Sequence, residues 1–140
     1  MNVPLVDLGW QHAQIAEEVE QGFSRVLERT SFVLGPDVAD FEERYAQYSG
    51  VRHCVGVGSG TDAIELALRA LDLAPGSDVI VPANTFIATA LAALRGGFGV
   101  KIVDIDEGTF LMEPGRVQAA IGPEVSAVVP VHLFGQLAPV

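Results

Sequence analysis

Two different periods of apolar residues meet near the middle of the chain. A short apolar run, residues 54–57, is followed by the turn Gly58-Ser59-Gly60-Thr61 and then by apolar residues at helical spacing. Ser59 and Asp62 are three positions apart, the spacing of a helix N-cap and its acidic partner. We therefore predict a strand, a tight turn and a helix that begins near Gly60. The apolar stripe of this helix consists of Ile64, Ala67, Leu68 and Leu71.

The first fifty residues have the pattern of two helices. Residues 3–8 are expected to be extended, and residues 11–29 carry a regular apolar face opposite a run of glutamates. Pro36 suits the first position of a second helix, and Gly50 is a natural stop. Phe41, Tyr45 and Tyr48 repeat at helical spacing in this helix, and such an aromatic stripe usually serves packing.

The second half of the chain repeats the order strand, turn, helix. Asn84 or Thr85 could cap the next helix, and Gly96-Gly97 would end it. Strands that alternate with helices, and that are apolar on both faces, predict a mostly parallel sheet in a three-layer α/β/α arrangement. Counting residues 54–57, the pattern gives four strands. The other expected strands are residues 78–82, 100–104 and 125–131, and the helices are residues 86–94 and 114–121.

Composition and charge narrow the classes of function. The 140 residues are 49% hydrophobic, enough for a real core, and no apolar run reaches the roughly 20 residues of a membrane helix. A net charge of −10 argues against nucleic-acid binding. No signal peptide is visible, so we expect a cytoplasmic protein that binds neither nucleic acid nor membrane. The single cysteine, Cys54, is expected in the core, and three scattered histidines give no zinc spacing.

The turn before the central helix could bind a phosphate. The first N–H groups of a helix have no partner inside the helix, and the helix dipole makes that end attractive to anions. Gly58 and Gly60 would permit close approach, and Thr61 adds a hydroxyl. The alternative is that glycine and serine only form the corner. The motif is neither a P-loop nor the dinucleotide fingerprint.

Four polar turns should converge, because parallel strands present their carboxyl ends at one edge of the sheet. These turns are residues 58–61, 82–86, 104–106 and 132–136. Their sequences and the blocks around them are G-S-G-T-D-A-I-E-L-A-L, V-P-A-N-T-F-I-A-T-A, V-D-I-D and P-V-H-L-F-G-Q. In this order they resemble the DegT/DnrJ/EryC1/StrS family. The N-terminal V-D-L and F-V-L-G-P…F-E segments resemble it too.

The resemblance implies a fold, a cofactor and a reaction. Members are mostly pyridoxal-phosphate (PLP) aminotransferases of fold type I. They commonly transfer an amino group, often from glutamate, to a nucleotide-linked keto sugar, in polysaccharide or antibiotic sugar biosynthesis. Fold-type-I enzymes are dimers with shared active sites, so the resemblance also implies a homodimer.

The resemblance also implies roles for single residues. The turn that matches Gly60 and Thr61 binds the PLP phosphate, with Ser59 as the helix cap. The aromatic residue that matches Phe86 stacks on the cofactor ring; without the resemblance, Phe86 would be interpreted as a core residue. Asp104 and Asp106 are interpreted as turn formers. His132 and Gln136 fall near the site by position, with no role assigned.

No catalytic residue is expected among these residues. In the family, an Asp-x-x-Gln-like segment and the lysine that bonds to PLP come later in the chain, and Lys101 does not match that lysine. The expected organisation is an N-terminal helical arm, residues 1–50, and part of the PLP-binding domain, residues 51–140. By itself this chain should be inactive.

Two alternatives remain. The same family includes sugar dehydratases, in which a histidine replaces the lysine. A stand-alone phosphate-binding α/β module is the non-catalytic alternative, and it agrees with the length and with the lack of a nucleophile–base pair. The sequence that follows codon 140 would distinguish them: an open frame with the acidic block and a lysine favours the aminotransferase, and a stop codon favours the module.

Overall fold

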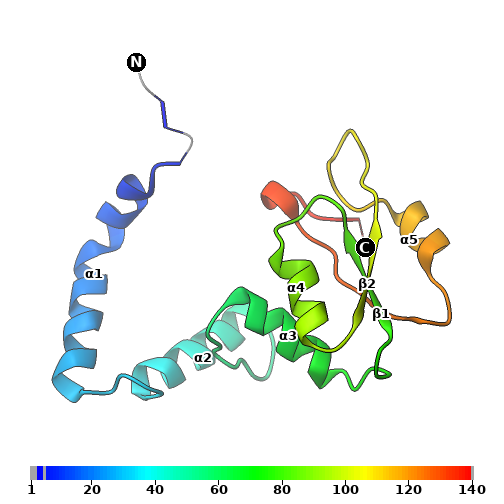
Figure 1. Cartoon of the computed structure of the whole chain (residues 1–140). Coiled ribbons are helices and arrows are strands. Elements are labelled where there is room, and N and C mark those ends of the chain that lie inside the picture. Colours follow the sequence, from blue (N-terminus) through cyan, green and yellow to red (C-terminus); the bar gives the residue numbers. More distant parts are fainter. Residues whose placement is uncertain (1–2, 5, 140) are drawn as a thin grey trace. The chain divides into compact units, whose positions relative to one another are not determined.

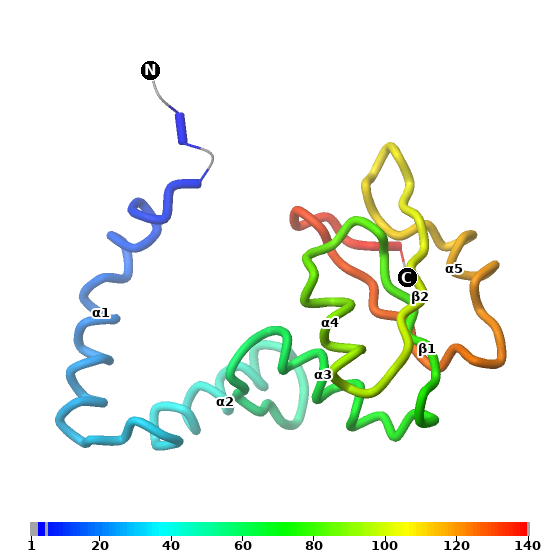
Figure 2. Tube along the Cα trace, in the orientation of Figure 1, coloured from blue at the N-terminus to red at the C-terminus, as the bar shows by residue number. Residues whose placement is uncertain are grey.

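The computed structural model describes residues 3–4 and 6–139. The chain divides into two compact units, Met1–Gly56 and Val57–Val140 (Figure 1). The trace in Figure 2 follows the second unit from its first helix to the C-terminal segment.

The first unit contains two helices, α1 (Leu8–Arg29) and α2 (Pro36–Ser49). Asp7 caps α1, since its side chain accepts the N–H of Trp10. Pro36 stands in the first turn of α2, and Gly50 ends that helix with a φ of 67°. Both predicted helices are confirmed, and α1 begins three residues earlier than expected, at Leu8 rather than Gln11. Residue 5 of the expected extended segment lies outside the described residues.

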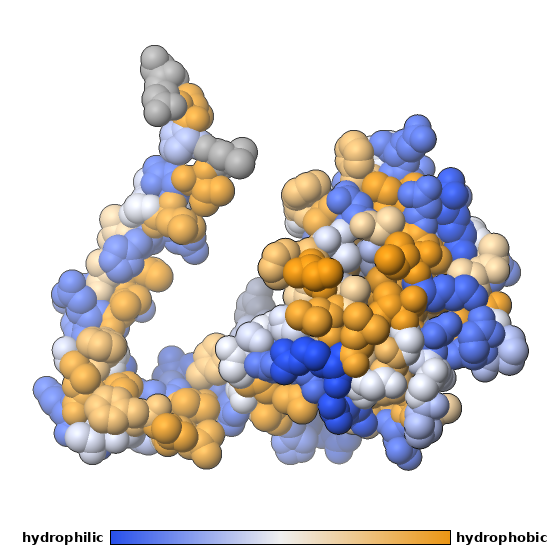
Figure 3. All heavy atoms as spheres, viewed as in Figure 1, coloured by the Kyte–Doolittle hydropathy of each residue, from blue (hydrophilic) through white to orange (hydrophobic). Residues whose placement is uncertain are grey.

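Apolar side chains in the first unit are largely exposed. The ring centroids of Phe41 and Tyr45 are 5.5 Å apart, and those of Tyr45 and Tyr48 are 6.2 Å apart, so the aromatic stripe packs mainly against itself. Figure 3 shows further apolar side chains along α1, which has no buried residue. None of the helices in the described part of the chain is long and apolar enough to cross a membrane.

The second unit is a parallel sheet covered on both faces. It follows the order α3 (Gly60–Ala70), β1 (Asp78–Pro82), α4 (Ala88–Arg95), β2 (Gly99–Val103), α5 (Pro114–Ala120), β3 (Val125–Val128) and the short 3₁₀ helix η1 (Leu133–Gly135). The strands lie in the order β2-β1-β3, and both pairings of β1 are parallel. The predicted parallel α/β class is therefore confirmed.

The central strand β1 has no exposed face. Val79 and Val81 pack with Leu68 of α3 and Ala93 of α4 on one side. On the other side, Ile80 packs with Val103 and Met112, next to α5. Figure 1 shows α3 and α4 on one face of the sheet and α5 on the other. Burial on both faces explains why the strand reads as a continuous apolar run.

The prediction of a fourth strand at residues 54–57 was wrong. No strand among the described residues pairs with this segment. The N–H of Gly56 instead donates to Glu42 Oε1 at 2.7 Å. A strand needs a neighbouring ladder, and an apolar run supplies none by itself.

Two element boundaries also differ from the prediction. Helix α4 begins at Ala88 with Ile87 at its N-cap position, so neither Asn84 nor Thr85 caps it. The Thr85 hydroxyl lies 2.8 Å from that of Thr89 instead. Strand β3 ends at Val128 rather than residue 131, and Pro130 could not donate a ladder hydrogen bond there.

We predict that Ile80→Ala strongly destabilises this unit, whereas Ile102→Ala does not. Ile80 is fully buried, so its truncation should cost about 2–5 kcal/mol or abolish the unfolding transition. Ile102 is 64% exposed in the adjacent strand, and its truncation should cost less than about 1 kcal/mol. Urea unfolding followed by circular dichroism measures both. Equal effects of the two substitutions would contradict the buried position of β1.

Candidate functional site

The N-terminus of α3 presents two free backbone donors. The N–H of Asp62 donates to Ser59 Oγ at 3.2 Å, and that of Ala63 donates to the Ser59 carbonyl at 3.0 Å. Among the residues that the structure describes, the N–H groups of Gly60 and Thr61 donate no hydrogen bond. The predicted cap and the helix start at Gly60 are both confirmed. Two adjacent N–H groups at the positive end of a helix are suited to an anion such as phosphate.

The glycines of this turn differ in how much space surrounds them. A Cβ added to Gly60 would meet no heavy atom within 4 Å. A Cβ added to Gly58 would lie 3.2 Å from the carboxylate oxygen Oδ2 of Asp62, so Gly58 makes room for that acid. Thr61 is half-buried and places a hydroxyl one residue further along the helix. The two free donors of Gly60 and Thr61, together with the open space at Gly60, fit a phosphate group.

Among the described residues, the side chain of Ser59, unlike the N–H groups of Gly60 and Thr61, already has hydrogen-bond partners within the helix terminus. Its Oγ lies 2.8 Å from Asp62 Oδ2, and a carboxylate can only accept, so the serine hydroxyl donates this hydrogen bond to the carboxylate. The same oxygen accepts the N–H of Asp62. Ser59 is therefore used in capping, which leaves the two following residues as the free donors.

Phe86 follows the carboxyl end of β1, just before α4. The residue is 77% exposed, and its carbonyl accepts the N–H of Thr89 at 3.1 Å. The alternative interpretation as a core residue is wrong for the described chain. An exposed aromatic ring at the carboxyl edge of a parallel sheet is available to cover a flat ligand.

The two aspartates after β2 are turn residues, as predicted. Asp104 Oδ1 accepts the N–H of Ile105 at 2.9 Å. Asp106 Oδ1 accepts the N–H groups of Gly108 and Thr109 at 3.1 Å and 2.8 Å. Hydrogen bonds from Thr109, first from its side chain and then from its backbone, lower the pKa of Asp106.

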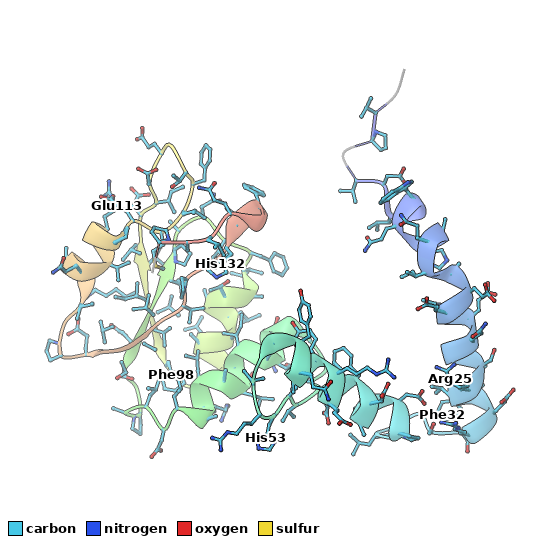
Figure 4. The ribbon with its side chains drawn as sticks, turned by 180° about the vertical axis from the view of Figure 1, so that it is seen from behind. Arg25, Phe32, His53, Phe98, Glu113 and His132 are labelled. Carbon is cyan, nitrogen blue, oxygen red and sulfur yellow. The ribbon has the colours of Figure 1, made fainter. Side chains whose placement is uncertain are left out.

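His132 supports the backbone of the C-terminal segment. Its Nδ1 accepts the N–H of Ala138 at 2.9 Å. Figure 4 shows this histidine on the segment that follows β3. Sequence reasoning missed this contact, since a lone histidine in a loop has no characteristic spacing. The side chain of Gln136 is exposed.

Lys101 and Cys54 have no part in the candidate phosphate site at Gly60 and Thr61. The Nζ of Lys101 donates to Glu124 Oε1 at 2.8 Å, and this bond is the main reason that the pKa of Glu124 is lowered. Lys101 therefore forms an ion pair between β2 and the residue before β3. Cys54 is a free, half-buried thiol rather than a fully buried one.

Comparison with known proteins identifies relatives over most of the chain. Residues 13–140 match the DegT/DnrJ/EryC1/StrS aminotransferase family. The UDP-N-acetyl-3-dehydro-alpha-D-glucosamine 3-aminotransferase of Acidithiobacillus ferrooxidans is 45% identical over 133 residues, which cover 95% of this chain and 36% of the relative. The chain thus spans about a third of the length of that relative.

Solved structures show the same fold. DesV from S. venezuelae, in complex with a ketimine intermediate, is 40% identical, with a TM-score of 0.90 over 97% of this chain and 37% of that one. NtdA from Bacillus subtilis, with bound cofactor PMP, is 38% identical, with a TM-score of 0.82 over 87% of this chain and 28% of that one. The predicted fold-type-I architecture is confirmed.

We predict that Asp106 titrates below its ordinary value and that Thr109→Val raises its pKa. A lowered folded pKa means that the ionised Asp106 stabilises the turn above about pH 3.8, the ordinary value. That stabilisation is lost as the pH falls through the lower folded pKa. Removal of the Thr109 hydroxyl removes the main cause of the shift. Carbon NMR of the carboxyl group over pH 2–6 measures the change, and an identical pKa in both proteins would refute the assignment.

Proposed function

The chain belongs to the DegT/DnrJ/EryC1/StrS aminotransferase family, and we propose that it holds the phosphate of PLP at the N-terminus of α3. The observation that carries this proposal is the pair of free N–H groups on Gly60 and Thr61. The Thr61 hydroxyl would add a third donor, and Ser59 would hold the helix end in shape. Phe86 would cover the face of the cofactor ring.

The proposed reaction is transfer of an amino group to a keto sugar. The curated relative from A. ferrooxidans is named as a 3-aminotransferase of a UDP-linked 3-dehydro sugar, which supports a nucleotide-linked sugar as the substrate class. An amino acid such as glutamate would be the donor. The product would enter polysaccharide or antibiotic sugar biosynthesis; a relative that is 41% identical over 135 residues is named an erythromycin biosynthesis sensory transduction protein.

The residues of this chain would bind and orient, and would not transfer protons. PLP, when bound, supplies an electron sink that stabilises the carbanion formed on the amino-acid carbon. Gly60 and Thr61 would fix the phosphate, and thereby the distance of the ring from the sheet edge. Phe86 would limit the ring to one plane and exclude water from that face.

The proposed organisation follows from this role. Residues 51–140 would form part of the PLP-binding domain, and residues 1–50 an N-terminal helical arm. We propose a homodimer, and a cytoplasmic location in which nucleotide-linked sugars are available. Transfer of the amino group to the sugar, rather than dehydration, would require a lysine. In the relatives, the corresponding position would lie outside the part that this chain matches.

We predict that Thr61→Val and Gly60→Pro both weaken PLP binding in the protein expressed from its complete reading frame. A hydrogen bond to a charged group contributes about 1.5–3 kcal/mol, so Thr61→Val should lower affinity by roughly ten- to a hundredfold. Gly60→Pro deletes a backbone donor at the first helical position, where the helix itself tolerates proline. Titration with PLP by absorbance measures the affinities.

Thr61→Ser is the matched control for this experiment. It keeps the hydroxyl, so its affinity should stay within about threefold of wild type. Wild-type affinity in both Thr61→Val and Gly60→Pro would show that the phosphate lies elsewhere. Binding of phosphate without any PLP binding would favour the non-catalytic module.

We also predict that Lys101 forms no stoichiometric adduct with PLP. Its Nζ forms an ion pair with Glu124 Oε1 at 2.8 Å, so the nitrogen is already engaged by a carboxylate. Incubation of the 140-residue chain with PLP, borohydride reduction and peptide mass spectrometry provide the test. A one-to-one pyridoxyl adduct on Lys101 would overturn this assignment and the expectation that this chain alone is inactive.

A further inference from the structure

An acidic side chain stands beside the donors that would hold the phosphate. Asp62 is the third residue of α3, and its carboxylate is fixed by two contacts. Oδ2 accepts the hydroxyl of Ser59 at 2.8 Å, and Oδ1 accepts Arg95 Nη2 at 3.0 Å. The side chain is 33% exposed, so it is partly shielded from bulk solvent.

The carboxylate of Asp62 stabilises the helix but would repel an anionic ligand. A carboxylate in the first turn interacts favourably with the helix dipole. A phosphate bound at Gly60 and Thr61 brings a second negative charge to the same terminus, and two like charges at short range repel each other. The site therefore needs a cation on Asp62 that does not occupy the phosphate position.

Arg95 is placed to be that cation. It is the last residue of α4 and reaches α3 from a different element, 33 positions along the chain. Its Nε also lies 2.9 Å from Glu65 Oε2, in a side chain that is only 13% exposed. The guanidinium is thus held between two carboxylates of α3.

A second arginine completes the cluster. Arg69 Nη2 lies 3.0 Å from Glu65 Oε1 and donates to the backbone carbonyl of Arg95 at 2.8 Å. The cluster of Asp62, Glu65, Arg69 and Arg95 contains two negative and two positive charges, so it is neutral as a whole. It joins the phosphate end of α3 to the end of α4, the helix that begins just after Phe86.

We propose that Arg95 is a positioning residue for the phosphate of PLP. It neutralises Asp62 and fixes the first turn of α3 against α4, so that the free N–H groups face an anion without a competing negative charge. This inference rests on the proposed function, because it requires the phosphate to bind at Gly60 and Thr61. An ordinary surface ion pair would contribute little and would not distinguish a phosphorylated ligand from its dephosphorylated form.

The test compares PLP with pyridoxal, which lacks the phosphate, in the protein expressed from its complete reading frame. Arg95→Gln should weaken PLP binding by about tenfold and change pyridoxal binding by less than about twofold. Arg95→Lys keeps the charge and should retain most of the PLP affinity. Asp62→Asn in the Arg95→Gln background should restore PLP affinity to within about threefold, since the repelling charge is gone.

The outcomes separate three explanations. Equal weakening of PLP and pyridoxal by Arg95→Gln, or no recovery in the double variant, would show that the cluster is only structural and would overturn the proposal. Unchanged PLP affinity in Arg95→Gln would overturn it as well. If Thr61→Val binds PLP like wild type, the phosphate site itself is wrong and the proposed function fails first.

If Arg95→Gln does not fold, the comparison of Arg95→Lys with Asp62→Asn still decides. The proposal requires both variants to retain PLP affinity, and a large loss in either would overturn it.

Discussion

The burial of β1 on both faces is the constraint on which the second unit depends. Val79, Ile80 and Val81 are each at most 1% exposed, so helices must cover both sides of this strand. Covering both faces forces the chain to leave the sheet and return after each strand, which gives parallel pairing with β2 and β3. The turns that follow β1 and β2 then lie at the carboxyl edge of the sheet, and Phe86 belongs to the turn after β1.

Much of this arrangement could be predicted from local pattern. The helix start at Gly60 and the cap by Ser59 depend on neighbours three residues apart, and such contacts are visible in sequence. The strand expected at residues 54–57 was wrong because its existence depends on a partner strand, which local pattern does not contain. The start of α4 at Ala88 was missed because Thr85 bonds to Thr89 instead of capping the helix.

In the candidate site, too, local features could be predicted from the sequence and contacts between distant residues could not. Gly60 and Thr61 could be proposed from the sequence because unpaired N–H groups follow from the position of a helix start. Arg95 was not found, because its contact with Asp62 spans 33 residues and two helices. Nothing in the sequence around Arg95 distinguishes it from an ordinary basic residue at the end of a helix.

The central claim is that the N-terminus of α3 holds the phosphate of PLP. A crystal structure of the PLP complex, from the complete reading frame, tests this most directly. The account predicts phosphate oxygens at about 3 Å from the backbone nitrogens of Gly60 and Thr61, with the cofactor ring against Phe86. A phosphate bound at any other position, with these two N–H groups free or solvated, would contradict the account.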